Sequence, residues 1–430
     1  MAHLLIIENW VEGTGRLFPA TIRRLGHTYT FVTRNKDHYV DKKSPQMHPI
    51  FEYAENILTL ETNDIDALIE QLRAQHRLLH FDGVSTICDY YVDTVAQVAQ
   101  ALDLPQAFSS NVVLERRKHL VRQALQRAGI QNPKFAVTSD WTETVAAADR
   151  IGYPLVLKPC DLASSAFVKL IDSEAQLREG FTELQAFTHN FRGQARDALW
   201  LLEEFMQGDE VSVEAVTFQG ETTIVGITDK SLTGFPYFIE DGHMFPARLE
   251  AGLAEAVTTY VTQALEAVGH DHGISHTEVK LTPAGPRLVE INPRPGGNFI
   301  AELIQLVTGI DLLETHVNLA LNRQPALDGL EHCRGSAAVK FLVPPAAGVL
   351  KALEGGEKLQ QNPNLVRWRL AAVSDMKIAA PIDNACYLGH VISRDSEGDQ
   401  ARCFAEQALS ELRLLYSEAA DQSPPKGVHR

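Results

Sequence analysis

The segment that decides the fold runs from residue 276 to residue 298 and reads HTEVKLTPAGPRLVEINPRPGGN. The part from Pro283 to Pro286 has the composition of a turn, so the segment predicts two strands joined as a hairpin. Side chains alternate between the two faces of a strand. His276, Glu278 and Lys280 are therefore expected on one face of the first strand.

Acidic and amide side chains recur on the returning strand. Glu290 and Asn292 share one of its faces, and Glu278 lies on the strand before it. Two carboxylates and an amide oxygen are hard ligands of the kind that hold Mg²⁺ beside substrate phosphates. The solvated face of an antiparallel hairpin produces the same alternation without a function, so the hairpin alone leaves both interpretations open.

Outward from the hairpin, the chain divides into mixed α/β and α+β units. Short apolar runs at residues 4–7, 28–32 and 83–87 alternate with helix-like segments, which predicts an open α/β sheet. A basic helix is expected over residues 115–120, and strand-rich sequence over residues 200–292.

The length of 430 residues fits three domains. We expect an N-terminal α/β domain on the substrate side, a central domain with a small lid, a C-terminal α+β domain and a flexible tail. Their expected bounds are 1–110, 111–325 with the lid at about 120–205, 326–420, and 421–430.

The bulk composition excludes several classes of protein. The net charge is −16, from 39 basic and 55 acidic residues, and such a charge repels a phosphate backbone, so nucleic acid is not an expected partner. No apolar run is long enough to cross a bilayer or to form a signal peptide, and we expect a cytoplasmic protein. Five scattered cysteines disfavour a zinc site and a disulfide framework.

The hairpin resembles the metal-binding strands of ATP-grasp enzymes such as biotin carboxylase and D-alanine:D-alanine ligase. Residues matching Glu278, Glu290 and Asn292 bind Mg²⁺ or Mn²⁺ in that family. The resemblance implies an ATP-grasp fold with a biotin-carboxylase-like N-terminal α/β domain and a C-terminal α+β segment. It also implies that ATP is used.

Further matches follow in the family's usual order. The strand ending at Lys158 looks like a nucleotide strand, Lys118 lies where an earlier ATP lysine is expected, and residues 202–214, LEEFMQGDEVSVE, resemble the adenine hinge. The ATP-contacting residues that the resemblance implies are Lys118, Lys158, Ser164, Ser165, Glu203, Phe205, Met206 and Glu210.

The chain departs from the family pattern at two places. Residues 160–166, CDLASSA, occupy the position of the phosphate-covering loop, which is usually glycine-rich and here contains no glycine. His276 stands where D-alanine:D-alanine ligase has an arginine, two residues before its first metal-binding acid.

Within the superfamily, the chain is most similar to bacterial L-amino acid ligases, which are dipeptide synthetases, and to related peptide-antibiotic amide ligases. The similarity rests on residues 229–246, 276–280 and 292–297. It implies catalytic roles for Arg294, His243, His276 and Lys280, and a substrate pocket lined by Glu240, His243, Arg294, Gly297 and Asn298.

The implied function is an amide bond formed between an amino acid or similar carboxylate and an amine, through an acyl phosphate, with release of ADP and phosphate. The partners are then small molecules, and the protein is a monomer or a homodimer. The alternatives are an ATP-grasp ligase of nucleotide or cofactor metabolism, a biotin-carboxylase-like enzyme, and a nonenzymatic ATP-binding regulator.

Two local patterns have a structural alternative. Gly296 and Gly297 can form a tight turn, with Asn298 capping a helix that begins at Phe299, instead of bordering the substrate pocket. The sequence His-Asp-His at residues 270–272 superficially suggests a metal site, but its short spacing favours a surface loop.

Overall fold

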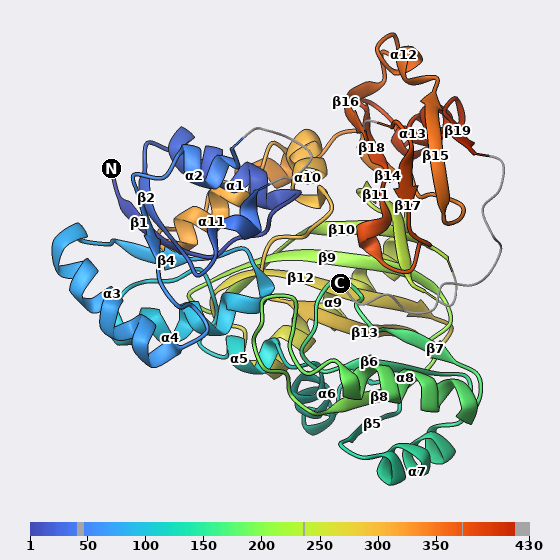
Figure 1. The fold of residues 1–430 in the computed structure, drawn as a ribbon, viewed down its shortest axis with the longest axis horizontal. Coiled ribbons are helices and arrows are strands. Elements are labelled where there is room, and N and C mark those ends of the chain that lie inside the picture. Colours follow the sequence, from blue (N-terminus) through green and yellow to red (C-terminus); the bar gives the residue numbers. More distant parts are fainter. Residues whose placement is uncertain (41–46, 235–236, 372, 418–430) are drawn as a thin grey trace.

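The computed structural model describes residues 1–40, 47–234, 237–371 and 373–417, and the tail expected at 421–430 lies outside these ranges. The chain begins with an open parallel sheet of strand order β3-β2-β1-β4 (Figure 1). Its strands are β1 (His3–Ile7), β2 (Thr28–Thr33), β3 (Asn56–Thr59) and β4 (Gly83–Ser85). The helices of this region are α1 (Thr14–Arg24), η1 (Lys36–Tyr39), α2 (Pro49–Glu52), α3 (Ile65–Leu79), η2 (Asp89–Tyr91) and α4 (Val92–Leu102).

Strand β1 is buried on both faces. Leu4 and Ile6 belong to one hydrophobic cluster, and Leu5 and Ile7 belong to another. A parallel strand covered on both faces requires this continuous apolar run. The predicted open α/β sheet is confirmed.

The second unit is a four-stranded antiparallel sheet of order β5-β8-β6-β7, which we call the lid. It consists of β5 (Phe135–Thr138), α7 (Trp141–Ile151), β6 (Leu155–Pro159), β7 (Lys169–Ile171), α8 (Glu174–Ala186) and β8 (Trp200–Glu204). Apolar side chains of α7 and α8 pack on one face of the sheet.

The largest sheet has eight antiparallel strands in the order β13-β12-β9-β10-β11-β14-β18-β16. Five strands come from the central part of the chain: β9 (Asp209–Phe218), β10 (Glu221–Thr233), β11 (Ile239–Phe245), β12 (Gly273–Thr282) and β13 (Gly285–Asn292). The other three, β14 (Ser336–Phe341), β16 (Leu365–Leu370) and β18 (Gly389–Asp395), come from the C-terminal segment. The sheet therefore contains strands from both sides of the predicted domain boundary at residue 325. The position of that boundary stays a prediction.

A small sheet of order β17-β15-β19 completes the C-terminal segment. The elements here are η3 (Asp328–His332), β15 (Gly348–Glu354), α12 (Gly356–Leu359), β17 (Met376–Ile378), η4 (Asn384–Cys386), α13 (Ala401–Ser410) and β19 (Arg413–Tyr416). None of the helices in the described ranges is both long and apolar enough to span a membrane.

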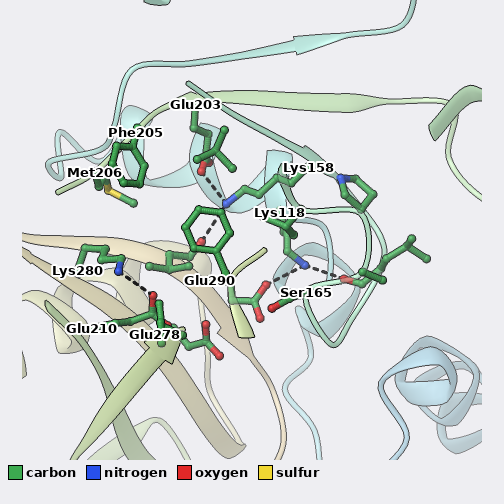
Figure 2. Close-up of a pocket in the computed structure, with 18 of the residues that line it drawn as sticks. Lys118, Lys158, Ser165, Glu203, Phe205, Met206, Glu210, Glu278, Lys280 and Glu290 are labelled. Atoms are coloured by element: carbon green, nitrogen blue, oxygen red, sulfur yellow. Dashed lines mark hydrogen bonds and ion pairs between the residues drawn. The ribbon is translucent and has the colours of Figure 1, made fainter. Parts of the chain in front are cut away.

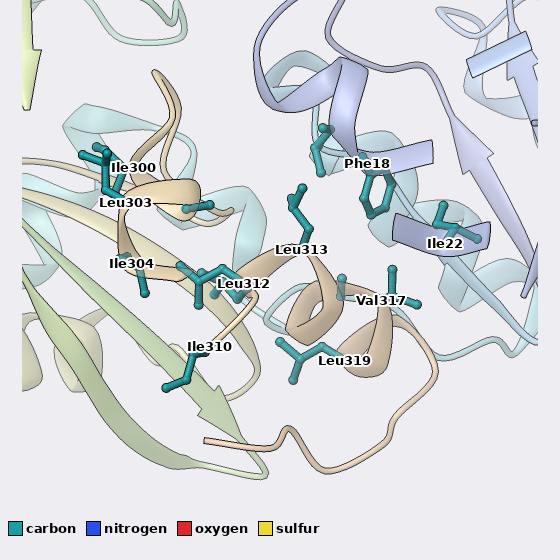
Figure 3. Close-up of a cluster of buried hydrophobic side chains, with 14 of the residues drawn as sticks. Phe18, Ile22, Ile300, Leu303, Ile304, Ile310, Leu312, Leu313, Val317 and Leu319 are labelled. Atoms are coloured by element: carbon teal, nitrogen blue, oxygen red, sulfur yellow. The ribbon is translucent and has the colours of Figure 1, made fainter. Parts of the chain in front are cut away.

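Two helices run between the large sheet and the N-terminal unit. They are α10 (Ile300–Thr308) and α11 (Leu312–Ala320), within the apolar pattern that follows the hairpin. Figure 3 shows Leu313 and Val317 of α11 beside Phe18 and Ile22 of α1, within one hydrophobic cluster. This contact fixes the N-terminal sheet against the strands that carry the pocket.

We expected strand-rich sequence from residue 200 to residue 292, and this was wrong for residues 251–268. Helix α9 (Ala251–Val268) interrupts the strands and buries Val257, Val261, Leu265 and Val268 at helical spacing. Its apolar residues pack beneath the central sheet.

The single basic helix expected over residues 115–120 is also wrong, because the chain breaks there. Helix α5 (Val112–Glu115) ends before Arg116, and α6 (Lys118–Arg127) begins after Arg117. Both intervening arginines form ion pairs outside the helix, Arg116 with Asp89 and Arg117 with Asp93 and Asp197. The backbone amide of Lys118 donates to the carbonyl oxygen of Cys160, which links α6 to the phosphate loop at residues 160–167.

Candidate active site between the lid and the central sheet

A pocket opens between the lid and the strands β9 to β13 (Figure 2). The lid covers one side, and the hairpin β12–β13 forms the floor. Its charged lining residues are Lys118, Lys158, Glu203, Glu204, Glu210, Glu240, Glu278, Lys280 and Glu290. Of the ATP-contacting residues that the resemblance implies, all except Ser164 line this pocket. Ser164 is exposed and precedes Ser165, which does line the pocket.

The hairpin aligns the two acids of the expected metal site. Glu278 pairs with Glu290 across the strands, and His276 pairs with Asn292. Residues directly opposite each other in an antiparallel pair project from the same face, so both carboxylates enter the pocket together.

Lysine side chains compensate these acids. Lys118 Nζ lies 2.8 Å from Glu290 Oε2, and Asn292 Nδ2 donates to Glu290 Oε1 at 2.9 Å. Burial alone would raise the pKa of Glu290, but Lys118 and Asn292 hold that pKa well below its ordinary value. Glu290 is therefore a carboxylate at neutral pH.

Lys230 of β10 is a residue that the sequence reasoning missed. Its Nζ lies 2.8 Å from Glu278, 3.0 Å from Glu240 and 3.1 Å from Glu210, and its side chain is 1% exposed. Burial disfavours the charged form, but the three carboxylates raise the pKa of Lys230 well above its ordinary value. No local pattern marks this lysine, because the carboxylates that pair with it lie on three other strands.

Glu203, at the end of β8, has two cationic partners. Glu203 Oε2 lies 2.6 Å from Lys158 Nζ, and Glu203 Oε1 lies 2.5 Å from Arg122 Nε. Arg122, which is completely buried in α6, was also missed. Both oxygens of Glu203 are thus engaged by cations. The adenine contact expected of Glu203 stays a prediction.

The adenine hinge contributes backbone and apolar surface. Phe205 and Met206 line the pocket between the lid and β9, and the Phe205 and Phe238 ring centres lie 6.5 Å apart. At the start of β9, Glu210 Oε2 accepts from Lys280 Nζ at 3.2 Å. This arrangement suits a flat base beside an acid that can accept from hydroxyl groups.

The glycine-free phosphate loop adopts a conformation that glycine favours. Ser164 and Ser165 have φ angles of 60° and 54°, and Phe167 has a φ of 60°. Left-handed backbone is uncommon for residues other than glycine and concentrates at functional sites. Lys118 Nζ also donates to the carbonyl oxygen of Leu162 at 2.8 Å, which ties the loop to the pocket.

Glu240 of β11, which the resemblance implies as a substrate residue, lines the pocket. Asn298 Nδ2 donates to Glu240 Oε2 at 2.6 Å, and His243 Nε2 lies 3.3 Å from the same oxygen. Tyr387 of the C-terminal segment donates its hydroxyl to the Glu240 carbonyl oxygen at 2.6 Å. The C-terminal segment therefore supports strand β11 at Glu240.

His276 takes the place of the family's arginine as a buried cation. Its Nδ1 lies 2.7 Å from Glu214, and its Nε2 lies 3.2 Å from Glu278. Burial would lower the pKa of His276, but the two carboxylates raise it to about 9. The imidazole is protonated at neutral pH and supplies a positive charge at that position.

Arg294 is fixed by the N-terminal unit. Its Nε donates to Asp89 Oδ2 at 2.6 Å, and the other oxygen of Asp89 lies 3.5 Å from Arg116. Asp89 is completely buried, yet its pKa is lowered because the charges of the two arginines outweigh desolvation.

The residues present fit a divalent cation bound together with phosphates. Among the described residues, no group of three or more His, Cys, Asp or Glu side chains has the geometry of a metal site. Glu278, Glu290 and the amide of Asn292 supply three oxygen-bearing side chains on one hairpin face. Mg²⁺ commonly takes one or two carboxylates and completes its shell with phosphates and water.

Two local expectations are corrected. The N-cap of α10 is Phe299 and carries no side-chain cap, so Asn298 is not a helix cap; it contacts Glu240 instead. Residues 270–272 do connect α9 to β12, and Asp271 is exposed, but the side chain of His270 is buried and its Nδ1 lies 3.1 Å from Glu115.

Three family models match successive parts of the chain. An ATP-grasp N-terminal domain matches residues 21–106, an ATP-grasp domain matches residues 151–302, and the L-amino acid ligase C-terminal domain 2 matches residues 340–417. Together they follow the order of the units described above.

Individual relatives agree with these matches. Carnosine synthase 1 of Gallus gallus is 30% identical over 68% of this chain, and alanine–anticapsin ligase of Bacillus subtilis is 26% identical over 58% of it. The matched regions span 32% and 56% of those two proteins. The crystal structure of L-amino acid ligase from Bacillus licheniformis superposes with a TM-score of 0.80 at 23% identity, covering 97% of this chain and 99% of that one. The expected ATP-grasp fold is confirmed.

Proposed function

Because the chain belongs to the ATP-grasp superfamily and ends in the C-terminal domain of L-amino acid ligases, we propose that it joins an amino acid or similar carboxylate to an amine. The carboxylate takes the γ-phosphoryl group of ATP and becomes an acyl phosphate. The amine nitrogen then attacks the acyl carbon, and phosphate leaves. Relatives whose names denote the joining of amino acids, alanine–anticapsin ligase and carnosine synthase, support this reaction class.

One observation carries the proposal: the paired acids Glu278 and Glu290 and the acceptor-side acid Glu240 all line one pocket. Lys230 lies between the two sides, bonded to both Glu278 and Glu240. The proposed nucleotide site and the proposed amine site are then adjacent, as acyl transfer requires.

Cationic side chains stabilise the phosphates. Lys118 and Lys158 line the pocket, Lys230 pairs with its acids Glu210, Glu240 and Glu278, and Arg294 follows β13 and pairs with Asp89. Fixed charges in a dry site stabilise the charge that develops during phosphoryl transfer more strongly than water does. Mg²⁺ or Mn²⁺ held by Glu278, Glu290 and Asn292 would neutralise phosphate charge when bound.

The amine side is assigned to Glu240 and His243. The buried Glu240 carboxylate can hold an ammonium group, and His243 lies within 3.3 Å of it. This pair is placed to accept the proton that the amine loses as it attacks. Asn298 orients Glu240, and the substrate contact of its neighbour Gly297 stays a prediction.

A phosphate-release screen tests the proposal. ATP, Mg²⁺ and pairs of amino acids are incubated with the protein, and product masses are recorded. The expected result is a mass equal to the two amino acids minus water, with ADP and phosphate. Phosphate release that depends on bicarbonate or on a nucleotide substrate would indicate one of the other ligase classes, and nucleotide binding without turnover would indicate a regulator.

A further inference from the structure

A segment of the lid crosses to the N-terminal sheet. Residues 187–197 lie in the connection between α8 and β8, and we call them the lid strap. Its tip is internally fixed: the Asn190 side chain accepts from the backbone amides of Arg192 at 2.9 Å and Gln194 at 3.1 Å. His189 and Ala195 form a β-bridge beneath this turn. The strap therefore presents Arg192 from a preformed turn.

Arg192 inserts into a pocket at the carboxyl end of β1. Its Nη2 donates to the carbonyl oxygen of Asn9 at 2.5 Å, and its Nη1 donates to the hydroxyl of Tyr39 at 3.4 Å and lies 3.7 Å from Glu8 Oε2. The guanidinium carbon lies 5.8 Å from the centre of the Trp10 ring. Only 7% of Arg192 is exposed.

Three hydroxyl groups fix the carboxylate of Glu8 next to Arg192. Its carboxylate accepts from Tyr39 at 2.5 Å, from Thr62 at 2.9 Å and from Thr33 at 3.0 Å. Ligands of open α/β sheets bind beyond the carboxyl ends of the strands. In this protein an arginine of its own lid occupies that position.

The backbone of the strap is held as well. The carbonyl oxygen of Arg192 accepts from Arg34 Nη1 at 2.8 Å and from Asn63 Nδ2 at 2.9 Å. Gln194 Nε2 donates to the carbonyl oxygen of Tyr90 at 2.9 Å. Three residues of the N-terminal unit thus bind the strap around Arg192.

The other end of the strap holds the phosphate loop. Arg196 donates to Asp161 Oδ1 through Nη2 at 3.0 Å and through Nε at 3.2 Å, and the backbone amide of Asp197 donates to Asp161 Oδ2 at 2.9 Å. Asp161 begins the loop that carries Ser164 and Ser165. A continuous set of contacts therefore leads from Glu8 to the phosphate loop.

We propose that Arg192 is a positioning residue that binds the lid to the N-terminal sheet and thereby holds the phosphate loop closed over the nucleotide. The proposal rests on the proposed function in one respect: an acyl phosphate must be shielded from water until the amine arrives. Loss of the contact frees the strap, the loop opens more often, and water competes with the amine for the acyl phosphate. In this side reaction, water hydrolyses the acyl phosphate to the free acid and phosphate.

The first test compares Arg192→Met with a matched lid variant, Arg178→Met. Arg178 lies within the lid, where its guanidinium stacks 3.9 Å from the centre of the Trp141 ring. With a non-hydrolysable ATP analogue bound, Arg192→Met is expected to raise hydrogen exchange in residues 160–167 several-fold, and in turnover it is expected to raise the ratio of ATP consumed to amide formed. Arg178→Met should change neither quantity. Unchanged exchange and an unchanged ratio in Arg192→Met would overturn the proposal.

Chemical rescue distinguishes loss of the Arg192 guanidinium contact from a general loss of structure. Arg192→Ala leaves a cavity lined by Glu8, Tyr39 and the carbonyl oxygen of Asn9, which matches a guanidinium ion. Low, non-denaturing concentrations of guanidinium chloride should restore part of the ratio of amide to ATP consumed, and sodium chloride at equal concentration should not. If both salts act alike, the guanidinium contact does not perform the assigned role.

A milder variant covers the case in which loss of Arg192 prevents folding. Arg34→Met removes one donor to the Arg192 carbonyl oxygen at a side chain that is 35% exposed, so it creates no buried hole. It should increase exchange of residues 160–167 in the same direction by a smaller factor, and no increase would contradict the proposal. Because exchange is measured with nucleotide alone, it tests Arg192 even if no amide product is found.

Discussion

The carboxylate of Asp89 lies 2.6 Å from Nε of Arg294, although 205 residues separate them in the chain. Asp89 follows β4 of the N-terminal sheet, and Arg294 follows β13 of the central sheet. The N-terminal unit therefore orients an arginine that we propose to act on the phosphates. The two sheets must keep their relative position for the site to be complete.

Asp89→Asn is expected to destabilise the protein and to lower kcat more than it changes the Kd of ATP. Removing one partner of a buried ion pair leaves an uncompensated charge and costs on the order of 3 kcal/mol. Asp93→Asn is the control, because Asp93 pairs with Arg117 at 3.0 Å with both side chains more than 20% exposed; that change should cost less than about 1 kcal/mol. Denaturant unfolding and steady-state kinetics measure both effects, and equal losses in the two variants would contradict the assignment.

Lys158→Met should weaken nucleotide binding while sparing amino-acid binding. Losing a charged hydrogen bond to phosphate costs about 1.5–3 kcal/mol, or roughly 10- to 100-fold in Kd. Lys169→Met, which alters an exposed pair with Glu183 on the same lid, should leave the Kd unchanged. Calorimetry with ADP or an ATP analogue decides, and an unaltered Kd in Lys158→Met would remove this lysine from the site.

Glu278→Gln and Glu290→Gln should each retain the fold and lose most of the turnover. The change removes one carboxylate from a shared cation site, an effect worth several kcal/mol in metal-assisted catalysis. Manganese binding in the presence of nucleotide, followed by electron paramagnetic resonance, should weaken in both variants. Near-normal turnover and manganese binding in both would show that the acids are not metal ligands.

Variants of Asn298 are expected to change substrate selection without changing the stability of the fold. Its backbone has a φ of 47°, which glycine tolerates, and its side chain orients Glu240. Asn298→Gly is therefore expected to keep the unfolding midpoint while raising KM for the amine, and Asn298→Trp should in addition narrow the range of accepted amines. Parent-like amine preferences in both variants would place Asn298 outside the acceptor pocket.

The buried pair of His270 and Glu115 makes stability depend on pH. Burial would lower the pKa of His270, but Glu115 raises it above the ordinary value of 6.5. A raised pKa in the folded state means that the stabilisation is complete below about pH 6.5 and is lost as the pH rises through the folded pKa. The measurement compares the unfolding free energies of the parent and of His270→Gln between pH 6 and 9. The difference between the two free energies should shrink as the pH rises. A difference that grows with pH would contradict the ion pair.

Much of the fold and part of the candidate site followed from local sequence. The continuous apolar run from Leu4 to Ile7 indicates a strand buried on both faces, and the alternation around Glu278 and Glu290 indicates strands with one polar face. Helix α9 was missed because its small and β-branched residues resemble strand sequence when the period is not counted. The break at Arg116 and Arg117 depends on acids far away in the chain, which local propensity does not register.

The residues that complete the site depend on long-range pairing. Lys230 and Arg122 are single cations in the sequence, and their importance appears only when the sheet places carboxylates around them. The serines of the phosphate loop adopt left-handed backbone that their identity does not predict. The same limit applies to Arg192, whose pocket is assembled from residues more than 150 positions earlier.

The transfer of labelled oxygen tests the central claim most directly. An amino acid that is accepted as the carboxylate substrate is labelled with oxygen-18 in its carboxyl group, and it is incubated with ATP, Mg²⁺, the protein and the amine. If the amide forms through an acyl phosphate, one labelled oxygen must appear in the released phosphate, as mass spectrometry of the phosphate detects. Amide formed together with unlabelled phosphate, or label recovered in AMP, would contradict the account.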